Sequence, residues 1–231
     1  MNRITTMAAP LALAMTCACD SARAQNIFFD AFSGDQLRPR WQQPPPGHWE
    51  HTVADSRLTV SGLFFPGVPG QPNTAGIEAE FTNFKIENQI VTTVLGWNFG
   101  EGRKLSVNLT GRQGLQVAFG YDEMGGMPVI FMERPGASPP LLTTPAPGPG
   151  VHNFRLELDS DGLFLYVNGS IALHWAKGTG QPISRVEVEF AALHGAAFSP
   201  LHVDLMRIVP SPATMIVLLA GWVIVVRERR R

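Results

Sequence analysis

Apolar and polar residues alternate along many short stretches of this chain. Between 105 and 109, leucine and valine alternate with serine and asparagine, and the same period of two recurs at 154–158 and 186–190. This period places successive side chains on opposite faces of a β-strand. Turn sequences such as Asn168-Gly169 separate the stretches, and no helical period interrupts them. The pattern therefore predicts an all-β fold of many short antiparallel strands, a sandwich or a barrel.

The last two dozen residues have a different pattern. Residues 213–226 carry no charge and are followed by a cluster of arginines. As a helix this run would span ~21 Å, less than the ~30 Å hydrocarbon core of a bilayer, and arginines after it favour the cytoplasmic side. We therefore predict a transmembrane helix over 213–226 with residues 25–208 outside; a buried strand or core helix is the alternative. The residues that carry this prediction are Pro210, Ser211, Pro212, Arg227, Arg229, Arg230 and Arg231.

The N-terminus has the parts of a secretory signal peptide. A positive charge at Arg3 precedes the apolar residues 7–15, and Ala22 and Ala24 form a cleavage site of the A-x-A type. We expect a signal peptide over residues 1–24. Lipid attachment at one of the two cysteines, Cys17 or Cys19, is the alternative; cleavage after Ala24 would remove both and leave a mature chain without disulfides.

The region between these terminal segments is large enough for one domain, which we place at 25–208. Residues 25–212 carry 12 Lys and Arg against 17 Asp and Glu, a formal charge of −5. This acidic balance argues against binding to nucleic acid or to anionic lipid. The Pro/Gly-rich stretch 135–150 is interpreted as a loop, because strand patterns continue on both sides of it.

The C-terminal segment 209–231 resembles a known sorting signal. Val209-Pro210-Ser211-Pro212, the apolar run and Arg229-Arg230-Arg231 are similar to the PEP-CTERM signal of Gram-negative bacteria. The resemblance implies a partner, exosortase, which is a membrane-embedded protease or transpeptidase, and export to the cell surface or the matrix of bacteria that make exopolysaccharide. Ser211 stands where the family usually has glutamate, so a membrane anchor that is never cut is the alternative.

The patterned region resembles the concanavalin A-like lectin/glucanase jelly roll in its laminin-G-like bacterial versions. The similar segments are "FFDAFSG" with Trp41 downstream, "DSRLTVSG", and "HNFRLELDSDGLFLYVNGSIALHW". The resemblance implies a jelly-roll β-sandwich of two curved antiparallel sheets, with a concave face that often holds sugar. Members of the family include lectins, glycosidases and structural modules, so the fold does not choose the function.

Two pairs of glutamates at i, i+2 spacing are the candidates for glycosidase chemistry. Glu78 and Glu80 share one predicted strand face, and Glu187 and Glu189 share another. A glycosidase needs two carboxyl groups at a defined separation. The laminarinase-type branch of the family carries them as Glu-x-Asp-x-x-Glu, which neither segment matches. We therefore interpret both pairs as solvated strand faces, predict no catalytic residue, and leave open whether the chain is an enzyme while favouring that it is not.

Metal ligands are sparse in the sequence. Asp159-Ser160-Asp161-Gly162 is similar to the start of a calcium loop, but Ser170 occupies the twelfth position, where the loop needs glutamate. The same residues suit a hairpin turn. His48 and His51 would point to opposite faces of a strand. We expect no metal and no other cofactor, with calcium as the alternative.

Two aromatic segments suggest a sugar site. Gly96–Glu101 and Gly120–Glu123 each combine an aromatic ring, a polar partner and glycines that permit close approach. The candidate carbohydrate-binding residues are Trp97, Asn98, Tyr121, Asp122 and Glu123. Core packing of Trp97 and a hairpin end at Tyr121 are the alternatives.

Together these features predict an exported surface or matrix protein, a non-catalytic module that contacts extracellular polysaccharide. A glycan-processing hydrolase on the same fold is the alternative, and a purely structural matrix protein is a third. A close pair of carboxylates on the floor of a concave cleft would favour the hydrolase, whereas acids on the outer face of the sandwich would argue against it.

Overall fold

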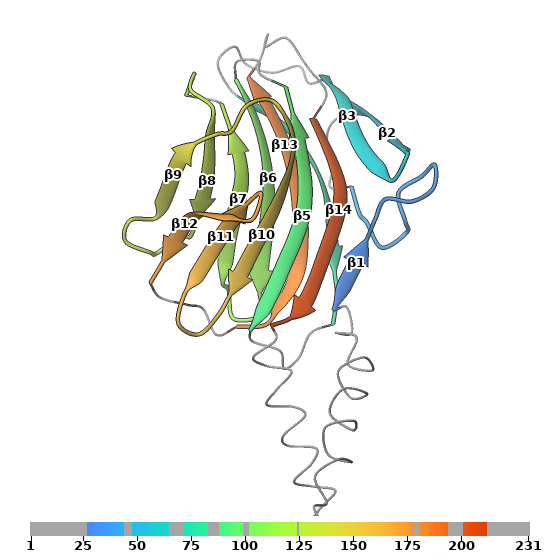
Figure 1. Ribbon diagram of the computed structural model, residues 1–231. Helices are drawn as coiled ribbons and strands as arrows, with labels where there is room; N and C mark the ends of the chain where they lie inside the picture. The colour runs from blue at the N-terminus through green and yellow to red at the C-terminus, as the bar shows by residue number, and fades with distance from the viewer. Residues whose placement is uncertain are drawn as a thin grey trace, which may run out of the picture.

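The structure is a computed structural model, and it describes residues 27–43, 48–64, 72–82, 88–98, 102–123, 125–176, 178, 181–193 and 201–211. Strands and their connections make up these residues, without a helix (Figure 1). The predicted all-β class is confirmed. The strands are β1 (Phe28–Asp30), β2 (His48–Ala54), β3 (Arg57–Phe64), β4 (Pro72–Glu80), β5 (Gln89–Trp97), β6 (Arg103–Gly111), β7 (Gln116–Asp122), β8 (Val129–Glu133), β9 (Leu141–Pro145), β10 (Gly150–Leu158), β11 (Leu163–Val167), β12 (Ser170–Trp175), β13 (Ile183–Leu193) and β14 (Leu201–Pro210).

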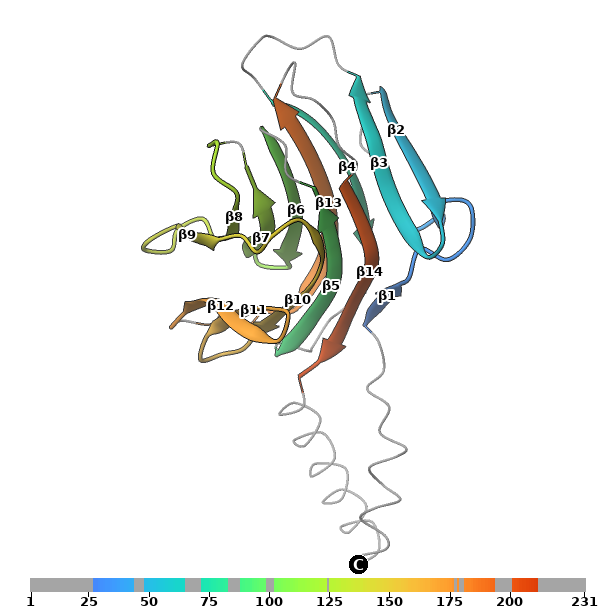
Figure 2. The ribbon, with the colours of Figure 1, turned by 45° about the horizontal axis from the view of Figure 1, so that its top comes forward.

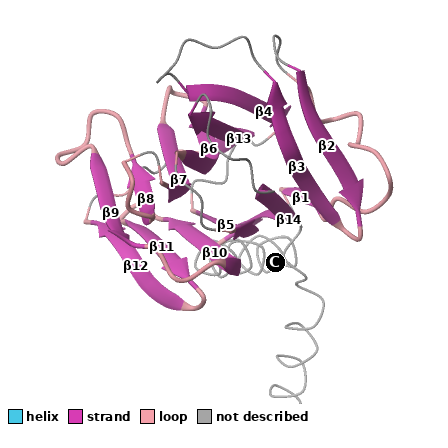
Figure 3. Cartoon of the chain, turned by 90° about the horizontal axis from the view of Figure 1, so that it is seen from above, coloured by secondary structure: helices cyan, strands magenta, loops and turns pink. Residues whose placement is uncertain are grey.

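The strands form two antiparallel sheets that stack as a jelly-roll-like sandwich. The eight-stranded sheet has the order β12-β11-β10-β5-β14-β3-β2, with β1 paired to β14 (Figure 2). The six-stranded sheet has the order β4-β13-β6-β7-β8-β9. Seen from above, the eight-stranded sheet curves around one face of the six-stranded sheet (Figure 3). The predicted sandwich of two antiparallel sheets is confirmed.

The hydrophobic core lies between the two sheets. In the six-stranded sheet the register aligns Val188 with Val107 and Val107 with Phe119, and all three side chains are fully buried. Phe154 of β10 meets Phe119 from the other sheet, with ring centroids 6.2 Å apart. Burial of each such side chain contributes roughly 1.5–3 kcal/mol. The alternation seen in the sequence therefore marks which residues point inward.

The predicted hairpin residues form turns. Asn168 and Gly169 connect β11 to β12, both with positive φ (51° and 84°), as a type I′ turn requires. The Asp159 amide donates to the Gly162 carbonyl oxygen at 3.0 Å, which closes the connection between β10 and β11. Among the described residues no cluster of three or more His, Cys, Asp or Glu side chains has the arrangement of a metal site.

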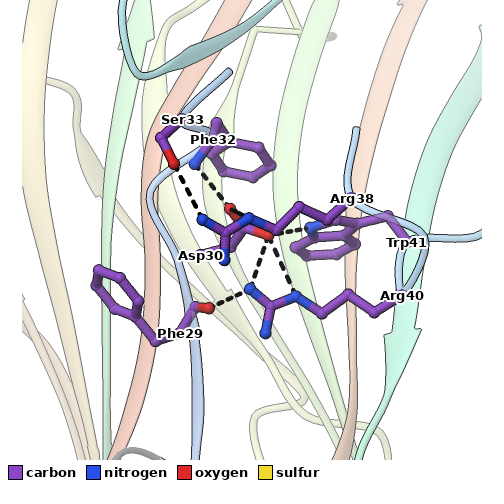
Figure 4. Close-up of polar contacts among 7 residues, drawn as sticks. All are labelled: Phe29, Asp30, Phe32, Ser33, Arg38, Arg40 and Trp41. Atoms are coloured by element: carbon purple, nitrogen blue, oxygen red, sulfur yellow. Dashed lines mark hydrogen bonds and ion pairs between the residues drawn. The ribbon is translucent and has the colours of Figure 1, made fainter. Parts of the chain in front are cut away.

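A buried carboxylate anchors the N-terminal segment of the fold. Asp30 accepts hydrogen bonds from the Phe32 amide at 2.8 Å, from Trp41 Nε1 at 2.9 Å and from Arg40 Nη2 at 2.9 Å (Figure 4). Arg38 adds a second guanidinium, with Nε 3.7 Å from Asp30 Oδ1. Trp41 stacks on Phe32 with centroids 5.7 Å apart. The "FFDAFSG" motif and its downstream tryptophan thus form one cluster that fixes the connection between β1 and β2.

The C-terminal predictions fall mostly outside the described residues. β14 continues to Pro210, beyond the predicted domain end at 208, and the Ser211 amide donates to the Asn88 carbonyl oxygen at 2.9 Å. No helix in the described part of the chain has the length and apolar character to span a membrane. The positions outside the described residues are the signal peptide 1–24 with Ala22 and Ala24, the apolar run 213–226, and Pro212, Arg227, Arg229, Arg230 and Arg231.

His202 of β14 is packed against the backbone of Gly96 in the neighbouring strand β5. His202 pairs with Gly96 across β14 and β5, and a Cβ added at Gly96 would lie only 1.8 Å from His202 Nε2. Burial lowers the pKa of His202 below 6.5, and the positive charge of Arg57 lowers it further. The folded chain therefore binds a proton at this ring less readily than the unfolded chain does.

We expect the free energy of unfolding to decrease as the pH falls below about 6.5. At a pH above the pKa of the unfolded ring, both states hold the ring neutral and stability is not reduced. As the pH falls from that value to the lower pKa of the folded ring, stability is lost progressively, because only the unfolded chain takes up the proton readily. Burial lowers the pKa of His51 in the same sense. Urea titrations at about pH 7.5 and about pH 5.5 measure the loss. His202→Gln should lose less stability over this interval, and an equal loss in the variant would contradict the assignment.

Candidate functional site

The face of the six-stranded sheet that points away from the core carries glutamates from both predicted pairs. β13 buries Val186, Val188 and Phe190 in the core, so Glu187 and Glu189 point to the opposite face, where both remain partly exposed. The edge strand β4 presents Glu78 on the same face, opposite Glu187 in the register. We call this surface the solvent face.

A single asparagine joins the two glutamates of β13. Asn108 Nδ2 lies 3.4 Å from Glu187 Oε2 and 3.1 Å from Glu189 Oε2. These two distances add to 6.5 Å, which is the largest separation that the two oxygens can have. The amide holds both carboxylates in one place, because its two N–H groups can donate to two acceptors.

The second predicted glutamate pair behaves differently. Glu78 accepts a hydrogen bond from Arg185 Nη2 and forms an ion pair with it. Glu80, at the end of β4, is exposed. The structure therefore brings Glu78 into the same patch as Glu187, with Arg185 as its counter-ion, and leaves Glu80 at the edge.

A depression of ≈ 230 Å³ opens beside Glu187 on the solvent face. Glu187, Asn108, Ala118 and Glu133 lie in one row across β13, β6, β7 and β8. Three strand spacings separate the Cα atoms of Glu187 and Glu133 by roughly 14 Å. Ala118 contributes only a methyl group between them, which leaves space. The residues that line the depression are Asn108, Thr110, Gln116, Val117, Ala118, Glu133, Pro135 and Glu187.

A second depression of ≈ 450 Å³ continues from the first toward β4 and shares Thr110 with it. The residues that line it are Glu80, Phe81, Thr82, Thr110, Arg112, Ser184 and Arg185. Together the two depressions cross the strands from β4 to β8. We call this surface the groove. It spans roughly 19 Å, counted as four strand spacings.

The predicted sugar platform is not on this surface. Trp97 is 1 % exposed and stacks between Tyr121, with centroids 4.5 Å apart, and His152, with centroids 4.4 Å apart. Tyr121 is fully buried, and its hydroxyl donates to Glu123 Oε2 at 2.7 Å. Burial, reinforced by the hydrogen bond to Glu123, raises the pKa of Tyr121 well above its usual value. Both aromatic faces are used inside the core, so the expected exposed platform is corrected to core packing.

The remaining two predicted residues lie apart from the rings. Asn98 is exposed, and its backbone oxygen accepts from the fully buried Arg103 Nη2 at 2.6 Å. Asp122 is partly exposed and points to the face opposite Tyr121. The structure therefore brings Trp97, Tyr121 and Glu123 together, and leaves Asn98 and Asp122 outside that cluster.

Comparisons with known proteins give the fold. No family model matches the chain, and no curated protein matches it. An endo-β-1,3-glucanase from Pyrococcus furiosus is 12 % identical, with a TM-score of 0.62, and the match covers 79 % of this chain and 93 % of that one. A GlcNAcα1-4Gal-releasing endo-β-galactosidase from Clostridium perfringens is 12 % identical, with a TM-score of 0.61, covering 78 % and 61 %. The CBM2 module of the evolved Dit of Lactobacillus casei BL23 phage J-1 is 10 % identical, with a TM-score of 0.59, covering 79 % and 94 %.

These comparisons correct the functional prediction. At such identities the likeness extends to the jelly-roll fold and transfers no residue role. Solved structures of this fold nevertheless include the endo-β-1,3-glucanase, the endo-β-galactosidase and a laminarinase from Flavobacterium. These structures run against the expectation of a non-catalytic module and against the preference for a non-enzyme, and they favour the alternative, a glycan-processing hydrolase, as the function to propose.

Proposed function

We propose that this chain is an exported hydrolase that cleaves β-linked, uncharged polysaccharide in the groove. The observation that carries the proposal is the shared Asn108 contact, which holds Glu187 and Glu189 with oxygens no more than 6.5 Å apart beside an open depression. Glycosidases need two carboxyl groups flanking the scissile bond. The glucanase and galactosidase of the same fold support β-linked glycans as the substrate class.

The geometry supports distinct roles for the two glutamates. Glu187 lines the depression, so it takes the role of nucleophile that attacks the anomeric carbon. Glu189 does not line it and takes the role of acid, which gives its proton to the departing glycosidic oxygen. Water then enters, Glu189 accepts its proton, and the bond from Glu187 to the sugar is cleaved. Asn108 positions both groups.

The charge of the groove supports a neutral substrate. In the groove and at the adjacent Glu78 and Glu189, acidic residues outnumber basic residues. The depression beside Glu187 is lined by two acidic residues and no basic residue. Like charges brought together across an interface cost several kcal/mol, so uronic or sulfated units are expected to be rejected at the centre. The acidic residues are Glu78, Glu80, Glu133, Glu187 and Glu189, and the basic residues are Arg112 and Arg185.

Hydrolysis is expected to retain the anomeric configuration. Inverting enzymes keep their carboxyl groups about 6.5–9.5 Å apart to admit a water, whereas retaining enzymes keep them about 5–5.5 Å apart. The upper bound of 6.5 Å between Glu187 and Glu189 favours retention. ¹H NMR of the first product formed from laminarin, a β-1,3-glucan, should show the β-anomer before mutarotation. An initial α-anomer would contradict this pairing of residues.

The terminal segments suggest where the hydrolase works. The predicted signal peptide and the resemblance of the C-terminal segment to the PEP-CTERM signal support export and retention at the membrane, the cell surface or the matrix, with an exosortase-like protease as processing partner. A glycan hydrolase in that place would act on extracellular polysaccharide.

A further inference from the structure

A third hollow lies at the end of the groove, between the β8–β9 loop and the end of β12. It has a volume of ≈ 450 Å³ and is lined by residues 134–138 with Trp175 and Ala176. Pro135 lines both this hollow and the depression beside Glu187. The hollow therefore continues the groove toward the eight-stranded sheet, to which β12 belongs.

The walls of this hollow are built from fixed groups. The β8–β9 loop is closed by the Arg134 amide, which donates to the Pro140 oxygen at 2.8 Å, and by the Ala137 amide, which donates to the Arg134 oxygen at 3.1 Å. Trp175 Nε1 donates to the Pro139 oxygen at 3.2 Å, so the loop is tied to β12. Arg134 Nη1 lies 3.5 Å from the Gly178 oxygen. A ligand would meet a site that is already formed, which reduces the entropy cost of binding.

The chemistry of the lining fits a sugar ring. Proline and alanine carbons and the Trp175 side chain offer apolar contact, while Ser138 and Arg134 offer polar contact. Small-ligand sites combine an apolar lining with a few such polar groups, in volumes of about 300–1,000 Å³. The lining contains no acid, in contrast to the depression beside Glu187.

We propose that this hollow is a distal subsite that binds an unreacting sugar unit of the polysaccharide chain cleaved at Glu187. The inference rests on the proposed function, because it assigns the ligand to the same substrate. A chain that reaches both positions must span more than the roughly 14 Å between the Cα atoms of Glu187 and Glu133. Short oligosaccharides cannot do so, and the enzyme should therefore prefer long chains.

The test is a binding series with the inactive Glu187→Gln full-length protein. Calorimetry with β-1,3-gluco-oligosaccharides, from the disaccharide to the octasaccharide, should show a rise in affinity of about tenfold once the chain is long enough. Adding Ser138→Trp, which fills the hollow, should remove this rise and leave the affinity for short chains unchanged. Ser170→Trp, at the exposed start of β12 and at the opposite end of that strand from Trp175, is the matched control and should keep the rise.

Each result decides the proposal. An unchanged rise in the Ser138→Trp protein, or no length dependence in the parent, would overturn the subsite. If the Ser138→Trp protein does not fold, Ala176→Trp, directly after β12, fills the same hollow and replaces it. If the wild-type protein cleaves nothing but the rise disappears in Ser138→Trp, the subsite stands and the hydrolase proposal falls. If cleavage depends on Glu187 but the rise persists, only the subsite falls.

Discussion

Replacing Glu189 by glutamine should lower kcat on laminarin by roughly 10²–10⁴-fold, the usual contribution of a general acid. Glu187→Gln should lower it at least as much, because no covalent intermediate can form without the carboxylate. Reducing-sugar release from laminarin measures both. The amide is nearly isosteric with the carboxylate, so the hydrogen-bonding position beside Asn108 stays filled.

A substrate with an activated aryl leaving group separates the two roles. Such a group departs without a proton, so Glu189→Gln should show a burst of aryl release, whereas Glu187→Gln should show none. Glu157→Gln is the matched control. Glu157 lies on the eight-stranded sheet, where it contacts Arg155 and Tyr166, and its replacement should leave kcat unchanged. Full activity in both Glu187→Gln and Glu189→Gln would remove the proposed site.

Strands such as β6, β10 and β13 could be predicted from the sequence because the period of two and the turn residues are local properties. The stretch 186–190 shows this directly, since its valines and phenylalanine are buried and its glutamates reach solvent. The hairpin at Asn168-Gly169 follows from the positive φ that its type I′ turn requires. The prediction of a loop over 135–150 is wrong at 141–145, where β9 forms an edge strand. The order of strands in each sheet depends on contacts between distant segments, which no local pattern encodes.

The candidate site could be predicted only in part, because its residues come from strands that are distant in the sequence. Glu187 and Glu189 were recognised as a pair, but Asn108, which joins them, comes from β6, and Glu133 comes from β8. Only the register places Glu187, Asn108 and Glu133 in one row. The alternation of Leu105, Val107 and Leu109 with polar residues was a usable signal that Asn108 lies on the face opposite the core, although Ser106 on that face is 1 % exposed.

The error over the aromatic residues has a related cause. The prediction of a sugar site at Trp97 and Tyr121 rests on their neighbours in sequence, where flanking glycines are typical of an open surface. Gly120 instead allows close approach of strands, because a Cβ there would lie 2.1 Å from the Leu105 oxygen. Tyr121 follows it and points into the core, where it stacks on Trp97. A glycine next to an aromatic residue therefore signals close packing as readily as a ligand site.

Replacing Asp30 by alanine should destabilise the fold by about 3 kcal/mol, more than an average core substitution. The carboxylate is 0 % exposed, and its loss leaves the Phe32 amide and the Trp41 indole N–H buried without their acceptor. Each unsatisfied buried group costs about 1–3 kcal/mol. Losing the ion pair with Asp30 costs less at Arg40, because the Arg40 side chain is 34 % exposed and its guanidinium can hydrogen-bond to water instead. Urea denaturation followed by tryptophan fluorescence measures the change.

The buried network predicts a larger loss of stability at Asp30 than at Asp35 in the same segment. Asp35 is exposed in the connection that follows β1, so Asp35→Ala should change the free energy of unfolding by less than about 0.5 kcal/mol. Asp30→Asn keeps an acceptor oxygen for the indole or the amide but removes the charge opposite the arginines, so its loss should fall between the other two. If Asp30→Ala and Asp35→Ala were equally stable, the buried network would not hold this segment, and the stacking of Trp41 on Phe32 would have to do so alone.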